Sequence, residues 1–220
     1  MPSPTSSLFR QPPPSPTATH ATSTRLQAER NASGSLSPRY FERLYAEHPD
    51  PWAFATSPYE AAKYRASLRA LPHARYETAL EVGCAIGVLT RSLARRCSRL
   101  LAVDVSEAAL EQARARCAGG AARFERRAVP EHMPRGPFDL IVLSEVGYYW
   151  SEADLRSAQT AFARETRPGA HLLLVHYTGE TNYPLSADRV HGAFLSSPDW
   201  RPIRAAPQAT YRLDVLERAG

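Results

Sequence analysis

Apolar and polar positions alternate in blocks along the chain from about residue 77 onward. Short apolar runs of the kind that form buried strands are separated by segments in which apolar residues recur at helical spacing. The runs predict strands at 78–82, 100–104, 122–125, 138–144 and 171–176, with two more near 203–205 and 211–217. Strand and helix in alternation predict an α/β fold with a Rossmann-like, doubly wound, mostly parallel seven-stranded sheet and helices on both faces.

Two helices are expected before the first strand. Ser37 followed by Pro38 is a start signal, because the N–H that proline lacks would be unpaired at the first helical position anyway. A second helix starts at Ser57, with Glu60 at capping-box spacing, and Pro72 ends it. Its apolar face is expected to consist of Ala61, Tyr64, Leu68 and Leu71. Later helices are expected from Val88 to about Arg96, from Ser106 to about Cys117 and from Ser151 to about Arg167, where Pro168-Gly169 close the last one.

The charge balance is basic, with a formal net charge of +5 and a sequence pI near 9.3. A high pI is one flag for nucleic-acid binding. However, 26 of the 27 cations are arginines, and the positive excess is concentrated in residues 90–135, which are poor in aromatic side chains. Because single-strand binding needs basic and aromatic side chains interleaved, this pattern favours a local surface property, and we do not expect a nucleic-acid partner.

The cysteines Cys84, Cys97 and Cys117 form no C-x-x-C pair. Few and unpaired cysteines predict a reduced, intracellular protein, and we expect a cytoplasmic one that holds no metal. No run of 18 apolar residues is present, so neither a transmembrane helix nor a membrane partner is expected. The pattern does not define an oligomeric state.

The loop after the first expected strand is the most informative about chemistry. Gly83 and Gly87 would let the backbone pass close to a ligand at the carboxyl end of a parallel strand. Asp104 ends the next strand, where a carboxylate can accept two hydrogen bonds from a ribose diol. The spacing lacks the middle glycine of a dinucleotide fingerprint, and Glu81 would repel a diphosphate. S-adenosylmethionine, which has an ammonium, a sulfonium and a ribose but no phosphate, suits this loop better than a nicotinamide dinucleotide.

The segment Glu81–Gly87 with Asp104 resembles motif I and the second-strand acid of the class I S-adenosylmethionine-dependent methyltransferases. It departs from their E-x-G-x-G-x-G pattern at Ala85. A narrower group shares the stretches 50–52, 59–64 and 144–149. That group is the nodulation protein S (NodS-like) family of N-methyltransferases, which act on a de-N-acetylated chitooligosaccharide in nodulation-factor biosynthesis. The resemblance covers about residues 39–178 and implies the class I fold with N-terminal lid helices.

The resemblance also implies site residues. Backbone groups of Gly83, Cys84 and Gly87 would contact the methionine part of the cofactor. The acid that the family often has after the third strand is missing here, so adenine binding is expected from Ala128 and Val129. The full set of expected cofactor residues is Glu81, Gly83, Cys84, Ala85, Gly87, Asp104, Ser106, Ala128, Val129 and Ser144. The residues expected around the substrate are Tyr59, Lys63, Tyr148 and Tyr149.

Two residues are candidates for catalysis. Methyl transfer requires the acceptor and the methyl group to be held in line, and an amine acceptor must first lose its proton. Glu145 at the end of the fourth strand and His176 at the end of the fifth are placed to take that proton. Each has a structural alternative, because Glu145 can be a solvated rim residue and His176 a satisfied polar residue at a strand end. Glu81 can likewise brace its loop instead of contacting a ligand.

The composition divides the chain into two parts. Of residues 1–38, 20 are proline, serine or threonine, which leaves too little apolar surface to offset the entropy of ordering. We therefore expect a disordered tail over 1–37 and a single methyltransferase domain over 38–220. Within it we expect a helical lid at 38–75, a cofactor-binding core at 76–178 and C-terminal strands at 179–220.

The function expected from the loop and the resemblance is S-adenosylmethionine-dependent N-methylation of a small amine-bearing or saccharide acceptor. Two alternatives remain at this stage. The same fold can methylate an oxygen of a natural product, or a protein or RNA, because one scaffold serves many acceptors. A non-enzymatic interaction domain is the other alternative, and the intact Gly83–Gly87 loop with Asp104 argues against it.

Overall fold

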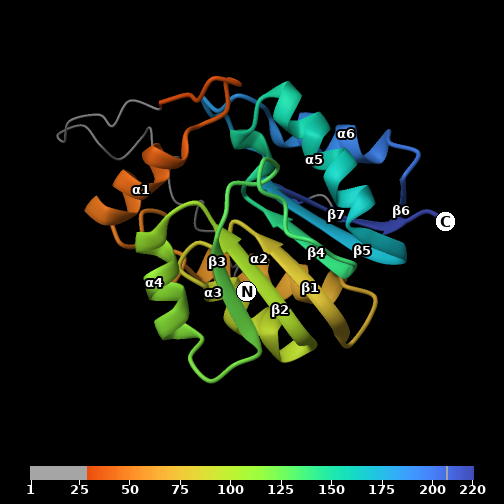
Figure 1. The fold of residues 1–220 in the computed structure, drawn as a ribbon, viewed down its shortest axis with the longest axis horizontal. Helices are drawn as coiled ribbons and strands as arrows, with labels where there is room; N and C mark the ends of the chain where they lie inside the picture. The colour runs from red at the N-terminus through yellow and green to blue at the C-terminus, as the bar shows by residue number, and fades with distance from the viewer. Residues whose placement is uncertain (1–28, 207) are drawn as a thin grey trace, which may run out of the picture.

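A seven-stranded sheet forms the centre of the computed structural model, which describes residues 29–206 and 208–220. The strands are β1 (Tyr76–Val82), β2 (Cys97–Asp104), β3 (Ala122–Arg126), β4 (Phe138–Ser144), β5 (Thr166–Tyr177), β6 (Trp200–Ala205) and β7 (Tyr211–Arg218). Their order is β3-β2-β1-β4-β5-β7-β6 (Figure 1). Neighbouring pairs are parallel except at β7, which is antiparallel to both β5 and β6. The predicted doubly wound, mostly parallel sheet is confirmed.

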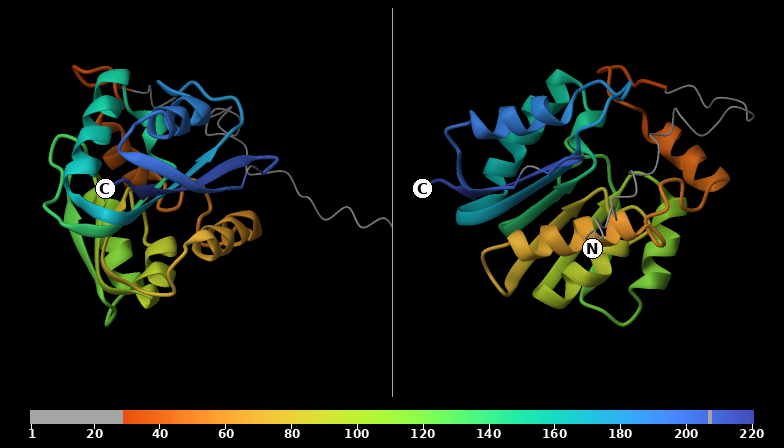
Figure 2. Two further views of the ribbon diagram at one scale, coloured as in Figure 1. Left: turned by 90° about the vertical axis from the view of Figure 1, so that its right-hand side faces the viewer. Right: turned by 180° about the vertical axis from the view of Figure 1, so that it is seen from behind.

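Helices cover both faces of this sheet (Figures 1 and 2). They are α1 (Pro38–Glu47), α2 (Pro58–Ala70), α3 (Val88–Leu93), α4 (Glu107–Arg116), α5 (Glu152–Arg164) and α6 (Ala187–Leu195), with 3-10 turns η1 (Ala94–Arg96) and η2 (Gly147–Tyr149). On one face α5 and α6 bury Phe162 and Phe194 against the sheet, and on the other α2 and α3 pack with Leu93. The central strands β1 and β4 are covered on both faces, which explains their nearly continuous apolar sequences.

Serine caps position most of the helices. Each of α1, α2, α4, α5 and α6 follows a serine whose side chain accepts a backbone N–H three residues on. Such a cap contributes on the order of 1 kcal/mol to helix stability. The exception is α3, which follows Gly87 in the left-handed region and has no side-chain cap. Among the described residues, no helix has the length and apolar character needed to cross a membrane.

Two expectations for the C-terminal part are wrong. Helix α5 ends at Arg164 rather than near Arg167, and Pro168-Gly169 lie within β5, where the register with β4 shifts. A proline is tolerated at such a bulge because no ladder hydrogen bond is required there. Residues 179–220 are also not only strands, since α6 forms at 187–195 with Val190 and Phe194 buried. Ser186 and the spacing of these apolar residues are the signals for it.

The predicted boundary at Ser37–Pro38 lies too far along the chain. Residues 29–37 already form a structured segment, in which Arg30 and Leu36 form an isolated β-bridge and Ser35 and Leu36 are buried. The Leu36 N–H donates to the Tyr149 carbonyl at 2.9 Å, so this segment is tied to the turn after β4. The remaining part of the predicted tail, residues 1–28, lies outside the described residues.

The face that α2 buries differs from the predicted one. Its buried residues are Glu60, Lys63, Ser67 and Ala70, whereas the predicted Ala61, Tyr64 and Leu68 are only half-buried. The predicted face is part of the buried surface, since Tyr64 and Leu68 pack against the core and Leu71 is buried. The apolar period does not predict the polar part, which is buried because α2 also forms a wall of the cavity described next.

Candidate functional site

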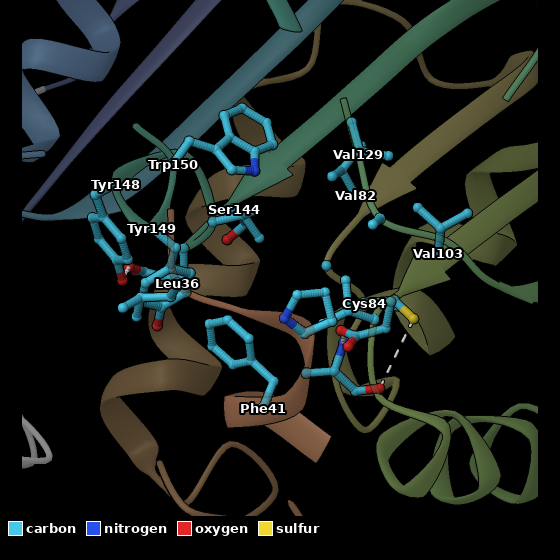
Figure 3. A pocket seen from close by; sticks show the side chains of 18 of the residues that line it. Leu36, Phe41, Val82, Cys84, Val103, Val129, Ser144, Tyr148, Tyr149 and Trp150 are labelled. Atoms are coloured by element: carbon cyan, nitrogen blue, oxygen red, sulfur yellow. Dashed lines mark hydrogen bonds between the residues drawn. The ribbon is translucent and has the colours of Figure 1, made fainter. Parts of the chain in front are cut away.

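A cavity of about 570 Å³ opens at the carboxyl ends of the parallel strands, where ligands of open α/β sheets bind. The ends of β1, β2 and β4 and the N-terminal part of α2 form its walls. Residues of the segment 31–36 and of α1 also line it. Figure 3 shows Tyr148 and Tyr149 on one side, Val82, Cys84 and Val103 on the other, and Phe41 of α1 between them.

The loop after β1 needs a glycine at Gly83. Its φ is 74°, and a Cβ there would lie 2.1 Å from Cγ2 of Val146, so no larger residue fits. The N–H groups of Gly83 and Cys84 both donate to the Val103 carbonyl, at 2.8 and 3.0 Å. The loop backbone is therefore held tightly against the ends of β2 and β4.

Asp104, at the end of β2, holds the backbone of this loop through hydrogen bonds. Its two carboxylate oxygens accept the N–H groups of Ala85 at 2.9 Å and Ser106 at 3.0 Å. Burial raises the pKa of Asp104, while these backbone hydrogen bonds lower it. The carboxylate thus spans the loop after β1 and the start of α4, with the cavity in front of it.

Glu81 presents a buried carboxyl group with an unpaired oxygen at the cavity wall. The side chain is 2% exposed, and its Oε2 has no hydrogen-bond partner among the described residues. Burial raises the pKa of Glu81 to about 8; the neighbouring Thr90 hydroxyl opposes the rise and the Asp104 carboxylate adds to it. Because an orphaned buried carboxylate costs free energy, this arrangement suits a ligand that brings a cationic hydrogen-bond donor.

Lys63, the only lysine of the chain, lies between two glutamates. Its ammonium donates to Oε1 of Glu60 at 2.9 Å and to Oε1 of Glu145 at 2.6 Å, and it is 2% exposed. The two carboxylates outweigh the desolvation of the ammonium, so the pKa of Lys63 is raised and the side chain stays charged. The ammonium also lies 5.2 Å from the ring centroid of Tyr59.

Glu145 accepts three hydrogen bonds from the protein. Besides Lys63, it accepts the Tyr148 hydroxyl and, at 3.0 Å, the Tyr177 N–H. Its backbone is in the left-handed region with φ 58°, which is uncommon for glutamate. The turn from β4 into η2 is therefore held in one conformation by this side chain.

His176 lies behind the cavity rather than in its wall. It is 0% exposed, and its Nε2 accepts the Gly147 N–H at 3.0 Å. Its other nitrogen pairs with His191 at 3.0 Å, and His191 pairs with Asp214 at 2.6 Å. Because Nε2 of His176 accepts the Gly147 N–H, it carries no proton. Nδ1–H of His176 therefore donates to Nε2 of His191, and Nδ1–H of His191 donates to Asp214. Burial lowers the pKa of both histidines, in keeping with two neutral imidazoles that end on the Asp214 carboxylate.

The structure brings most of the expected site residues together around one cavity. Those in its lining are Glu81, Gly83, Cys84, Ala85, Asp104, Ala128, Val129, Ser144, Glu145, Tyr59, Lys63, Tyr148 and Tyr149. It does not bring His176, Gly87 or Ser106 to the wall. Gly87 is required by packing, because a Cβ there would lie 2.9 Å from Ala113, and Ser106 caps α4.

Several lining residues are not among those expected from sequence. Glu60 carries only a capping-box signal in the sequence, and Tyr177 and Tyr183 carry none that distinguishes them from core aromatics. The lining residues between 31 and 36 lie in the serine-rich segment that the composition assigns to the tail. Among the described residues, no cluster of three or more metal-ligating side chains is present.

The sheet order, the single antiparallel strand and the glycine loop at the β1 end define the fold of the class I S-adenosylmethionine-dependent methyltransferases. The family model of Nodulation protein S (NodS) matches residues 41–174, and the chain belongs to this family. The Nodulation protein S of Rhizobium tropici is 35% identical over 127 residues, which are 56% of this chain and 53% of that protein. The chain thus spans about half the length of the curated relatives it matches.

Two solved structures are similar. The N-methyltransferase NodS of Bradyrhizobium japonicum WM9, in complex with S-adenosyl-L-homocysteine, aligns with a TM-score of 0.74 and 22% identity. The alignment covers 83% of this chain and 99% of that one. A candidate methyltransferase from Pseudomonas syringae aligns with a TM-score of 0.64 and 35% identity, over 73% of this chain and 99% of that one.

Proposed function

We propose that this protein is an S-adenosylmethionine-dependent N-methyltransferase that acts on a small amine-bearing acceptor, such as a de-N-acetylated saccharide. The observation that carries the cofactor assignment is the orphaned Glu81 carboxylate beside the glycine loop. An amino-acid ammonium favours the ionised form of this group and pairs with it, whereas the negative charge of a diphosphate opposes that ionisation. The similarity to the N-methyltransferase NodS of Bradyrhizobium japonicum WM9 supports an amine as the acceptor group.

The cavity wall offers a place for each part of such a cofactor. Glu81 and the backbone of Gly83 would hold the amino-acid part, and Asp104 would bond the ribose hydroxyls. Ala128 and Val129, which line the cavity beyond β3, would pack on the adenine. When bound, S-adenosylmethionine supplies an electrophilic methyl group on its sulfonium. The protein's own contribution is then to orient the acceptor and to exclude water from the closed site.

The acceptor end is formed by Lys63, Glu145 and a group of aromatic side chains. Tyr148, Tyr149 and Tyr183 pack against one another with ring centroids 4.7–5.0 Å apart. Aromatic faces of this kind suit a sugar ring or another compact acceptor. The segment 31–36 lines the same cavity, which favours a small molecule over a protein or RNA. No comparable observation favours an oxygen acceptor. A cytoplasmic location stays a prediction that the three free cysteines support.

Side-by-side methyl-release assays test this proposal. The protein is incubated with S-adenosylmethionine and with glucosamine, de-N-acetylated chitotetraose, N-acetylglucosamine, a phenol or tRNA. We expect methyl transfer to the two free amines and none to the acetylated sugar. Transfer to the phenol or the tRNA alone would contradict the acceptor class, while binding of S-adenosylhomocysteine without transfer to any acceptor would support an interaction domain instead.

A further inference from the structure

The carboxylate that sequence reasoning favours as the proton acceptor already receives three hydrogen bonds from the protein. Glu145 receives Lys63 on Oε1, and the Tyr148 hydroxyl and the Tyr177 N–H on Oε2. All three donors come from the protein itself. Only the second lone pair of Oε1 stays open to an acceptor amine, next to the Lys63 ammonium. Glu145 is therefore suited to holding Lys63 and the turn after β4 rather than to receiving a substrate.

Glu60, on the other side of the same lysine, differs in this respect. Its Oε1 accepts the Lys63 ammonium at 2.9 Å, but its Oε2 has no hydrogen-bond partner among the described residues. The residue is 4% exposed and belongs to the cavity lining. A buried carboxylate oxygen without a donor is costly, so a ligand that supplies an N–H to it is favoured.

The position of Glu60 reinforces this difference. In a complete capping box the glutamate side chain would bond back to the N–H of its serine cap. Here only half of the box forms: Ser57 Oγ accepts the Glu60 N–H at 3.3 Å, while the Glu60 carboxylate points to Lys63. The helix start thus fixes the backbone of Glu60 and leaves its side chain to the cavity wall.

The surrounding charges suit a cationic acceptor. The groups that face Glu60 are Lys63 and Tyr64 from α2 and Glu145 from the turn after β4. With two carboxylates and one ammonium ionised, the cluster carries one net negative charge. Burial raises the pKa of Glu60 and the Glu145 carboxylate adds to the rise, against the opposing effects of Lys63 and of the nearby Tyr64 hydroxyl. A carboxylate with a raised pKa is a better proton acceptor near neutral pH than an ordinary exposed one.

We propose that Oε2 of Glu60 binds the acceptor's amine and takes its proton, with Lys63 and Glu145 holding Glu60 in place. In this step an N–H bond of the acceptor's ammonium breaks, an O–H bond forms on Glu60, and the nitrogen keeps the electron pair. The neutral amine is then ready for methylation, and Glu60 returns its proton to solvent after release of the product. This assignment rests on the proposed function and makes Glu60 a catalytic residue.

The test compares Glu60→Gln with the wild type and with Glu111→Gln, which alters an exposed glutamate on α4. Calorimetry first measures S-adenosylhomocysteine binding, which we expect to change less than twofold in either variant. Glucosamine, and the disaccharide of two glucosamine units without acetyl groups, are then titrated into each S-adenosylhomocysteine complex. Because one charged hydrogen bond is lost, we expect about tenfold weaker binding of these amines in Glu60→Gln.

The pH dependence of kcat/KM gives the second readout. Loss of a general base lowers the rate by about a hundredfold at neutral pH. In Glu60→Gln the remaining rate rises with pH as free amine appears in solution, whereas Glu111→Gln keeps the wild-type profile. Glu60→Asp retains the carboxylate and should recover part of the rate, which keeps the test valid if Glu60→Gln folds poorly.

The outcomes separate the two proposals. Wild-type affinity for the amines and a wild-type pH profile in Glu60→Gln would overturn the role of Glu60. It would also be overturned if the wild-type complex bound neither amine while still binding S-adenosylhomocysteine, and the cofactor assignment would then stand. Absence of S-adenosylhomocysteine binding in the folded wild type would overturn the proposed function itself.

Discussion

At the scale of single residues, Glu81 is the group whose protonation should respond most directly to the cofactor. With its pKa raised to about 8, it carries a proton at pH 7 in the ligand-free protein. An arriving ammonium favours the ionised form, so binding must release that proton. Affinity for S-adenosylhomocysteine should therefore rise between pH 6 and pH 7.5, by up to about tenfold per pH unit.

Calorimetry in two buffers with different ionisation enthalpies measures this proton release. In Glu81→Gln we expect the release and the pH dependence to disappear, with affinity about tenfold weaker at pH 7.5. Glu111→Gln is the matched control, because its side chain is exposed on α4. Equal pH dependence in the wild type and Glu81→Gln would show that Glu81 only braces its loop.

Gly83 gives a second prediction at this scale. In Gly83→Ala the new Cβ would clash with Val146 at a positive φ, so Val146 and the adjoining Glu145 turn must shift. We expect a loss of about 2–4 kcal/mol of stability and weak cofactor binding. Gly119→Ala is the control, since Gly119 also has a positive φ but nothing within 4 Å of the added Cβ. Denaturant unfolding should show a loss of only about 1–2 kcal/mol there; equal losses in both variants would contradict the packing argument.

At the scale of elements, hydrogen bonds hold the segment 29–37 to the start of α5, and two of them go to the Asp154 carboxylate. The hydroxyls of Ser33 and Ser35 both donate to Oδ2 of Asp154, and Ser35 also accepts the Ser151 N–H at 2.7 Å. Asp154→Ala should loosen this segment and, because residues 31–36 line the cavity, weaken S-adenosylhomocysteine binding by about threefold to tenfold.

The neighbouring Glu152 provides the comparison for Asp154. It lies in the same first turn of α5 but bonds Arg189 on the surface. Glu152→Ala should leave cofactor affinity unchanged while lowering stability slightly. Unchanged affinity in Asp154→Ala would mean that the segment does not contribute to the binding wall.

The buried chain from His176 to Asp214 links η2, α6 and β7. Asp214 is 2% exposed and also accepts the Arg212 Nε–H at 2.8 Å. In Asp214→Asn the charged acceptor is lost, and we expect a decrease of about 2 kcal/mol in the free energy of unfolding. Asp188→Asn removes only the exposed partner of Arg212 and should change the free energy of unfolding by less than about 1 kcal/mol. Urea unfolding of both variants measures the difference. Equal losses of stability would show that the buried chain from His176 to Asp214 does not stabilise the fold.

At the scale of the whole molecule, the sheet and the cofactor end of the site are the parts that can be predicted from the sequence. Continuous apolar strands, serine caps and the glycines of the first loop act locally, so their signals lie within a few neighbouring residues. The acceptor end is different, because Glu60, Glu145 and Tyr177 meet only through long-range packing. The buried polar residues of α2 have no signal in its apolar period for the same reason. The ordering of residues 29–37 likewise depends on Asp154 and Tyr149, far along the chain.

The measurement that tests the central proposal most directly is the titration of S-adenosylhomocysteine into the wild-type protein, with Asp104→Ala and Glu111→Gln as variants. We expect one molecule to bind per chain, with NADH giving no heat. Affinity should fall at least about tenfold in Asp104→Ala, which loses the proposed ribose contact, and stay unchanged in Glu111→Gln. Absence of binding to a wild-type protein with an intact circular dichroism spectrum, or equal binding by Asp104→Ala, would contradict the proposed cofactor site.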